Sequence, residues 1–138
     1  MGLFTKIFGK SDADSGQSSR PRGRILVVET SVTVSKVIEL TLRDFVVTTA
    51  STIEQARTSI SAATPDLVIA SVALADGDGY EFCRSVTADP LHPCPIILLH
   101  GTFETVDQER ARSCGASAVL AKPFEPAKLR AVIDQALG

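Results

Sequence analysis

Five residues that can do chemistry follow short apolar runs in this chain. They are Glu29 and Thr30 after the run 25–28, Ser71 after 67–70, His100 after 95–99, and Lys122 after 117–120. The carboxyl ends of parallel strands meet at one edge of a sheet, and open α/β folds place their chemistry there. We therefore expect these five side chains to form one pocket.

Two kinds of chemistry are considered for this pocket: hydrolysis by a nucleophilic serine, and acceptance of a phosphoryl group with Mg²⁺ bound. Serine, histidine and glutamate are the parts of a hydrolase triad, but the residues around Ser71 lack the G-x-S-x-G turn that exposes such a nucleophile. A carboxylate at position 71 would be able to accept a phosphoryl group or bind Mg²⁺. A serine hydroxyl is a weak nucleophile unless a base activates it.

The elements that position these residues alternate along the chain. Apolar runs rich in branched residues predict strands at 25–28, 45–50, 67–70, 95–99 and 117–120, and helices are predicted at 33–43, 52–63, 78–88, 104–115 and 125–137. One apolar helical stripe consists of Val34, Val37, Ile38 and Leu42, and another of Leu129, Val132, Ile133 and Leu137. Helix ends are expected at Ser51 or Thr52, Asp78, Thr102 and Gly115. The pattern predicts a doubly wound (βα)5 domain with right-handed crossovers.

Composition fits one α/β domain and disfavours several classes of protein. The chain has 138 residues and a net charge of −2, with +3 on residues 1–24 and −5 on the remainder. An acidic body argues against a groove-filling nucleic-acid binder, so we expect no nucleic-acid partner. No run approaches the ~20 apolar residues of a membrane span. The three cysteines are odd in number and form no CxxC pair, which predicts reduced thiols in a cytoplasmic protein.

The first 23 residues are predicted to form a tail outside the domain at 24–138. The stretch 11–23 has the Ser-, Asp-, Gly- and Arg-rich composition of a flexible linker. Before it, Leu3, Phe4, Ile7 and Phe8 fall on one side of a short helix. This segment is either a frayed terminus that packs loosely on the domain or on nothing, or a weak anchor for a membrane surface or a partner groove.

A set of motifs at characteristic spacing resembles the bacterial response-regulator receiver domain. The motifs are Ile-Leu-Val-Val at 25–28, Pro-Asp-Leu-Val-Ile-Ala at 65–70, Asp-Gly-Tyr-Glu-Phe-Cys at 78–83, Pro-Ile-Ile-Leu-Leu at 95–99, Gly-Ala at 115–116 and Lys-Pro-Phe-Glu at 122–125. The resemblance covers the chain from Arg24 to Leu137. It implies a flavodoxin-like parallel sheet with strand order 2-1-3-4-5.

The same resemblance reveals four departures in the pocket. The acidic pair that binds Mg²⁺ in the family falls on Glu29 and Thr30, and the phosphoacceptor aspartate falls on Ser71. The threonine or serine after the fourth strand falls on His100, and the switch aromatic of the fifth strand falls on Val119. Lys122 alone matches the family's active-site set. The chain is therefore interpreted as a degenerate, or pseudo-, receiver.

These departures disfavour both phosphorylation and hydrolysis. Mg²⁺ requires near-octahedral oxygen ligation, and Glu29 is the one carboxylate that remains. In the implied strand order, the strand of Ser71 lies between those of Glu29 and His100, whereas a triad needs the histidine between serine and acid. We expect His100 to be a polar or packed residue at a strand end, and Lys122 to pair with Glu29. We expect no enzymatic activity and no cofactor.

Three hypotheses about function follow. The first is a phosphorylation-independent signalling adaptor whose partner face, implied by the resemblance, carries Glu104, Arg110, Lys122, Phe124 and Lys128. Because Val119 replaces the switch aromatic, that face is expected to keep one arrangement. The second is a response regulator that accepts a phosphoryl group by atypical chemistry, and the third gives the main role to the N-terminal anchor.

The expected partners are other signalling proteins, with a homodimer as an alternative. The resemblance points to bacterial motility or polarity signalling, and to recruitment of a cytoplasmic protein to a membrane-associated or polar complex. Because no further domain follows Gly138, neither DNA binding nor an appended enzyme is expected.

Overall fold

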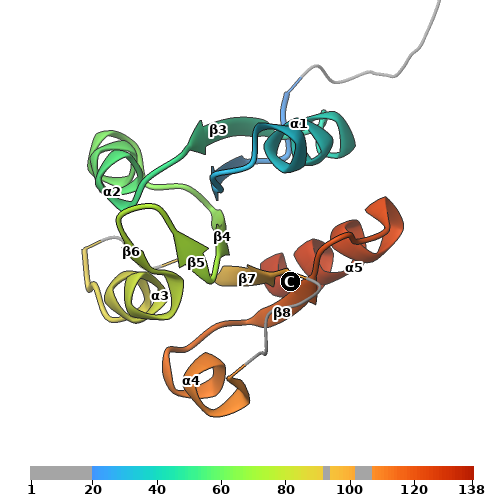
Figure 1. Cartoon of the computed structure of the whole chain (residues 1–138). Coiled ribbons are helices and arrows are strands. Elements are labelled where there is room, and N and C mark those ends of the chain that lie inside the picture. Colours follow the sequence, from blue (N-terminus) through green and yellow to red (C-terminus); the bar gives the residue numbers. More distant parts are fainter. Residues whose placement is uncertain (1–19, 92–93, 102–106) are drawn as a thin grey trace, which may run out of the picture.

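Five parallel strands form a single sheet at the centre of the domain. A computed structural model describes residues 20–91, 94–101 and 107–138. The strands are β2 (Arg24–Val28), β3 (Val46–Ala50), β4 (Leu67–Ser71), β7 (Ile96–His100) and β8 (Ala118–Ala121). Their spatial order is β3-β2-β4-β7-β8, so the five strands counted along the chain lie in the order 2-1-3-4-5 (Figure 1). The predicted α/β fold and strand order are confirmed.

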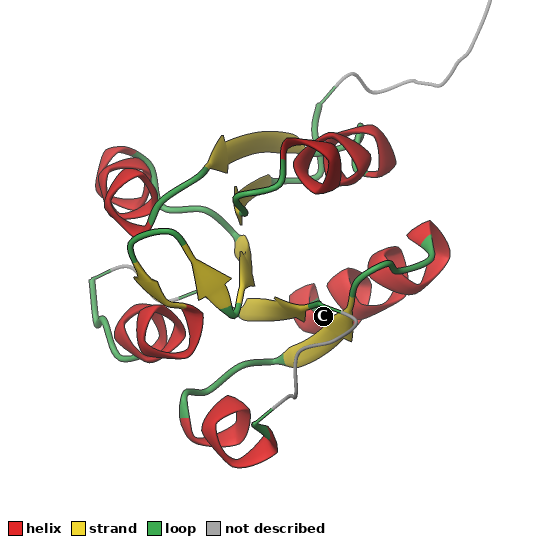
Figure 2. Cartoon of the chain, viewed as in Figure 1, coloured by secondary structure: helices red, strands yellow, loops and turns green. Residues whose placement is uncertain are grey.

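Helices cover both faces of this sheet (Figure 2). On one face lie α1 (Val32–Thr41) and α5 (Pro126–Leu137), and on the other lie α2 (Ile53–Ala62), α3 (Gly79–Thr87) and α4 (Gln108–Ser113). Each face has its own apolar core. Ile38 and Leu129 belong to the core under α1 and α5, whereas Phe82 and Ala111 belong to the core under the other three helices. β4 is buried along its whole length because both layers cover it.

Side chains cap the helices close to the predicted positions. Thr52 and Asp78 accept hydrogen bonds from the first turns of α2 and α3, as the sequence predicts. Gly115, with φ of 87°, follows the end of α4. The predicted start of α4 is wrong, because Asp107 is extended and caps a helix that begins at Gln108. Thr102, the residue proposed for that start, lies outside the described residues.

The apolar stripes predicted for α1 and α5 are wider than the buried sides of these two helices. Val37 is 40% exposed and Leu137 is 38% exposed, although Ile38, Leu42, Leu129 and Ile133 are fully buried. Consecutive helical residues point about 100° apart, so Val37 turns away from the sheet when Ile38 faces it. The described part of α1 therefore keeps apolar side chains on its solvent side.

A small hairpin lies between β4 and α3, where the sequence indicated a loop. It consists of β5 (Ala73–Leu74) and β6 (Gly77–Asp78), which pair antiparallel. Asp76, at its turn, accepts hydrogen bonds from Ile53 N at 2.8 Å and Glu54 N at 3.1 Å. The Asp76 carboxylate therefore attaches the hairpin to the start of α2. The N-terminus of the helix in turn favours the charged form of this carboxylate. These hydrogen bonds lower the pKa of Asp76, the bond from Ile53 most strongly.

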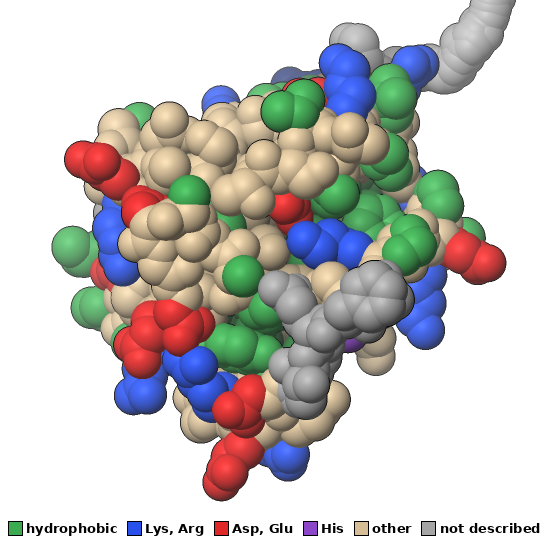
Figure 3. All heavy atoms as spheres, in the orientation of Figure 1, with side chains coloured by type: hydrophobic (Ala, Val, Ile, Leu, Met, Phe, Trp, Pro, Cys, Tyr) green, Lys and Arg blue, Asp and Glu red, His purple; other side chains and the backbone are tan. Residues whose placement is uncertain are grey.

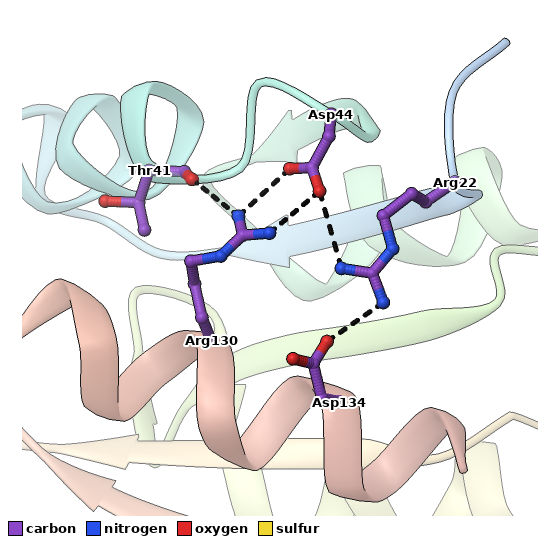
Figure 4. A network of polar contacts seen from close by, with 5 residues as sticks. All are labelled: Arg22, Thr41, Asp44, Arg130 and Asp134. Carbon is purple, nitrogen blue, oxygen red and sulfur yellow. Dashed lines mark hydrogen bonds and ion pairs between the residues drawn. The ribbon is translucent and has the colours of Figure 1, made fainter. Parts of the chain in front are cut away.

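A network of charged side chains joins α1, α5 and the first described residues (Figure 4). Arg130 donates to both carboxylate oxygens of Asp44, at 3.0 and 2.8 Å, and to the carbonyl oxygen of Thr41 at 3.0 Å. Arg22 bridges Asp44 and Asp134 and lies over the ring of Phe45. These contacts extend the packed part of the chain to Arg22. In the portion of the chain that the structure describes, the helices are too short or too polar to span a membrane.

Replacing Asp44 with asparagine should weaken the fold by about 1 kcal/mol at neutral pH, because the partly exposed ion pairs are lost. The Arg130 guanidinium lowers the pKa of Asp44 from its ordinary 3.8 to about 2. A depressed carboxyl pKa stabilises the fold above the ordinary value, and this contribution disappears as the pH falls toward 2. Urea unfolding at neutral pH and near pH 2 should show the gap between wild type and Asp44→Asn closing in acid. Glu109→Gln, on the exposed side of α4, is the control, and an unchanged gap would contradict the assignment.

Gly79→Ala should destabilise the fold much more than Gly77→Ala. A Cβ at Gly79 would lie 2.0 Å from the carbonyl oxygen of Ser71, and backbone cannot yield as a side chain does. At Gly77 the nearest atom is the flexible end of Ile53 at 2.8 Å. We expect a loss of about 2 kcal/mol or more for Gly79→Ala, typical of overpacking, in chemical denaturation. Equal losses at the two glycines would contradict the close approach of α3 to β4.

Candidate functional site

The ends of β2, β4 and β8 bring three of the predicted residues together. Lys122, directly after β8, places its Nζ 3.0 Å from Oε1 of Glu29 and 3.3 Å from Oγ of Ser71. Glu29 is 3% exposed and Ser71 is 2% exposed. The ion pair expected between Lys122 and Glu29 is present. Strand register explains the arrangement, because Val28 and Ala70, which precede Glu29 and Ser71, are partners across the sheet.

The second oxygen of Glu29 also has a partner. Oε2 accepts a hydrogen bond from the backbone nitrogen of Ser31 at 2.9 Å, and Ser31 in turn caps α1 through Val34 N. A buried carboxylate needs compensation of this kind, since removal from water costs several kcal/mol per ion. The ammonium group and the backbone N–H together supply it. Glu29 is therefore held between the start of α1 and the end of β8.

Thr30 lies on the solvent side of this cluster. It is exposed, and with Glu29 it lines a groove of about 390 Å³ that also includes Lys36 of α1 and Gln55 of α2. The Thr30 hydroxyl is uncharged, so this position adds no carboxylate to the groove.

His100 is half-buried, and the described polar contact of its ring is with the next residue, Gly101. Its Nδ1 lies 3.1 Å from the carbonyl oxygen of Gly101, and its strand partner is Ala121 of β8. The Ser71 hydroxyl instead accepts a hydrogen bond from the Lys122 ammonium, which cannot take a proton from it. The described contacts therefore do not assemble a hydrolase triad.

Val119, in the middle of β8, is half-buried and packs against the core under α2, α3 and α4. It lies on the sheet face that α4 covers. Its branched side chain has no polar group to exchange between the protein interior and solvent.

Arg110, predicted to lie on a partner face, is engaged within the domain. Its guanidinium pairs with Asp78, lies 3.8 Å from a carboxylate oxygen of Glu81 and stacks 4.7 Å from the centre of the Tyr80 ring. The Tyr80 hydroxyl accepts a hydrogen bond from Asp107 N at 3.1 Å. This cluster joins α3 to α4, and Figure 3 shows acidic and basic side chains gathered over these two helices. Burial tends to raise the pKa of Asp78, but the Arg110 hydrogen bond and others hold it below its usual range.

The sequence interpretation missed this α3–α4 cluster. Asp78 was recognised as a helix cap, but pairing with Arg110 depends on two segments 32 residues apart in the chain. Of the other candidate residues for the partner face, Lys128 is exposed and Phe124 packs partly on the core under α1 and α5. Glu104 and the candidate anchor residues Leu3, Phe4, Ile7 and Phe8 lie outside the described residues.

The pocket does not fit Mg²⁺, the ion that the resemblance implies. Both oxygens of Glu29 are committed to Lys122 and Ser31, and Ser71 and Thr30 carry no charge. Across 20–91, 94–101 and 107–138, no group of three or more His, Cys, Asp and Glu side chains could hold a metal ion. Mg²⁺ binding normally uses one or two available carboxylates together with phosphate oxygens and water.

The three cysteines are free thiols in this structure, with Cys83 and Cys114 buried and Cys94 partly buried. Burial raises the pKa of the Cys94 thiol to about 11, which disfavours the reactive thiolate at neutral pH.

Removing the lysine should reveal the cost of the buried carboxylate. Lys122→Met leaves Glu29 charged and without its cationic partner, so we expect a loss of about 3 kcal/mol in urea unfolding. Glu29→Gln in the same chain should recover part of that loss, because no buried charge then remains. Lys128→Met is the matched control on the exposed side of α5 and should change stability by about 0.5 kcal/mol or less. A Lys122→Met variant as stable as this control would refute a structural role for the ion pair.

Comparisons with known proteins agree with this architecture. The family model for the response regulator receiver domain matches residues 25–134. The chemotaxis response regulator CheY4 of Vibrio cholerae is 26% identical, with a TM-score of 0.75 over 86% of this chain and 99% of that chain. The signal receiver domain of a signal transduction histidine kinase from Syntrophus aciditrophicus is 29% identical, with a TM-score of 0.75 over 83% and 89% of the two chains.

Among characterised sequences, the DNA-binding response regulator MtrA of Mycobacterium leprae is 33% identical over 110 residues, covering 78% of this chain and 48% of the relative. The chain thus spans about half the length of this relative. The prediction that excluded nucleic acid from the partners is wrong, because a relative at this identity is a DNA-binding regulator. The acidic charge of one domain does not decide whether the protein that contains it acts on DNA.

The match over residues 25–134, the order of the five parallel strands and the lysine at the end of β8 agree with one another. The chain belongs to the response regulator receiver domain family.

Proposed function

We propose that this domain is a pseudo-receiver, a phosphorylation-independent adaptor that acts in signalling by binding other proteins. The observation that carries the proposal is the closed cluster of Glu29, Ser71 and Lys122. In this cluster, Lys122, which matches the lysine of the family, is paired with the carboxylate of Glu29. Ser71, which stands at the acceptor position implied by the resemblance, is almost fully buried.

The chemistry of Ser71 supports this proposal. A serine needs a base for nucleophilic attack, and its described polar neighbour is an ammonium group that only donates. A phosphoserine ester is also far more inert than an acyl phosphate, so it would serve poorly as a reversible signal. With Glu29 engaged by Lys122 and Ser31, the described residues of the pocket offer no further carboxylate to recruit the metal.

An adaptor acts through its surface and not through catalysis. The proposed binding face consists of α4, β8 and α5, where Lys128 is exposed. Val119 packs in the core behind α4, and Arg110 ties α4 to α3. Both features favour one arrangement of the face and therefore constitutive binding. The proposed partners are signalling proteins or a second copy of the chain, in motility or polarity signalling, with recruitment from the cytoplasm to a membrane-associated or polar complex.

The alternative is a receiver that accepts a phosphoryl group by atypical chemistry. Its support is membership of the receiver family and the position of Ser71, whose hydroxyl lies 3.3 Å from the lysine ammonium at the strand edge. An ammonium at that distance would be able to stabilise the charge of a transferred phosphoryl group. This alternative requires Lys122 either to leave Glu29 or to contact Glu29 and the transferred phosphoryl group at the same time.

Incubating the wild-type chain with acetyl phosphate and Mg²⁺ separates the two functions. The adaptor proposal predicts no mass increase of one phosphoryl group in the intact protein. A stoichiometric increase mapped to Ser71 would overturn the adaptor proposal and establish the alternative.

Restoring one carboxylate should not restore the reaction. Ser71→Asp alone is expected to remain unmodified, because Thr30 and the engaged Glu29 still leave Mg²⁺ short of ligands. Thr30→Asp combined with Ser71→Asp supplies the missing acid and is expected to give an acid-stable, base-labile acyl phosphate. Circular dichroism of both variants tests whether the added charge is tolerated. A folded Ser71→Asp variant that is fully phosphorylated would contradict this account of the metal site.

A further inference from the structure

The solvent side of α1 carries an apolar surface, which we call the α1 face. It consists of Val32, Val37 and Leu40, which are 83%, 40% and 52% exposed. At about 100° per residue the three side chains fall within an arc of roughly 140°. On the opposite side of the same helix, Ile38 and Leu42 are fully buried against the sheet. The helix is therefore apolar on two sides, and the described domain covers only the side that carries Ile38 and Leu42.

The described domain packs against α1 from the sheet and from α5. Arg130 of α5 reaches the carbonyl of Thr41, which places α5 alongside the last turn of α1. Single exposed apolar residues are common on protein surfaces, but here three large ones lie on the same side of a ten-residue helix. A contiguous exposed apolar patch is a feature of binding surfaces.

The described chain begins beside this helix. Arg22 donates from its backbone nitrogen to the carbonyl of Asp44 at 2.7 Å, and its guanidinium reaches Asp44 and Asp134. In Figure 4 these contacts lie between the end of α1 and α5. In Figure 1 the first described residues pass α1 before entering the sheet. The preceding residues are therefore tethered next to the α1 face.

We propose that residues 3–8 of the same chain dock on the α1 face. The sequence of this segment places Leu3, Phe4, Ile7 and Phe8 on one side of a helix, within an arc as wide as that of the α1 face. The two surfaces are of matching width and both apolar. Lys6 lies outside the apolar arc, and Glu39 borders the α1 face on the groove side of the helix.

Chain length permits this contact. Eleven residues lie between Phe8 and Arg20, and a polar linker of that length has a root-mean-square span of about 18 Å. Helix α1, with ten residues, is about 15 Å long. A tether of this length that starts at Arg20 is therefore long enough to reach along the whole of α1.

The small size of the α1 face favours a tethered segment over a second copy. Stable interfaces between proteins bury about 800 Å² on each partner, which a surface of three side chains does not approach. A short tether raises the effective concentration of the segment to about the millimolar range, where an interaction with a millimolar Kd is about half occupied. Docking is therefore expected to be partial and reversible.

Reversible docking makes the α1 face and an outside surface competitors for the same four apolar side chains. A segment that covers α1 cannot bury those side chains elsewhere at the same time. This contact goes beyond the proposed adaptor function and is independent of phosphorylation and of the face formed by α4, β8 and α5.

Amide NMR spectra of the full chain test the contact. Phe4→Asp combined with Ile7→Asp should shift the amide signals of Val32–Leu40 toward those of the released helix, with differences fading away from α1. Thr5→Asp adds charge outside the apolar arc and should leave the α1 signals unchanged. From the other side, Leu40→Asp should shift the signals of residues 3–8, and Leu91→Asp, at an exposed apolar site outside α1, should not.

Three outcomes would overturn the proposal. Differences confined to the substituted segment, or mapped to another face, would show that α1 is not its site. Shifts that grow with protein concentration would assign the α1 face to a second copy of the chain. α1 signals that stay the same in wild type and the double variant, while only wild type binds vesicles of phosphatidylglycerol, would assign the segment to a membrane surface.

Discussion

The buried carboxylate of Glu29 is the constraint on which the arrangement of the pocket depends. At 3% exposure it cannot be hydrated, so its charge must be compensated by the protein. The compensation comes from Lys122, 93 residues later in the chain, and from the backbone of Ser31. One ion pair thereby joins the end of β2 to the end of β8, across β4 and β7, and Ser71 at the end of β4 is the third member of the cluster. The same pairing that satisfies the carboxylate removes it from metal binding.

Two further charged clusters limit what the rest of the domain can do. On one side of the sheet, Arg110 holds α4 to α3 through Asp78 and the Tyr80 ring. On the other side, Arg130 and Arg22 share Asp44, which ties α5 and the start of the domain to the end of α1. Both clusters connect helices to one another at their surfaces. The domain thus has the architecture of a receiver. Ion pairs within the domain occupy the charged groups of its pocket and of its α3–α4 contact.

The success of sequence interpretation followed the range of the interactions involved. Strands, caps at Thr52 and Asp78, and the glycine after α4 were predictable because each depends on a few neighbouring residues. The pairing of Lys122 with Glu29 was also predictable, because the strand order of the family places their strand ends at one edge. The pairing of Arg110 with Asp78 was not, because nothing local to either residue indicates the other. Val37, predicted to share an apolar stripe with Ile38, is exposed, because the sequence pattern locates the apolar side chains of a helix but not how much of the helix its neighbours cover.

By itself, the sequence determined the fold class, the strand order through its family motifs, and the presence of Ser71 and Thr30 at positions where the resemblance to the family implies carboxylates. Residue identity carries these properties, because strand propensity, apolar patterning and the charge of a side chain are local. The tertiary structure decided which partners the charged groups take, that the His100 ring contacts the carbonyl oxygen of Gly101, and that one side of α1 stays apolar and exposed. Those outcomes arise from burial and from contacts between segments far apart in the chain, which compete for the same few hydrogen bonds and are settled only when the sheet and helices pack together.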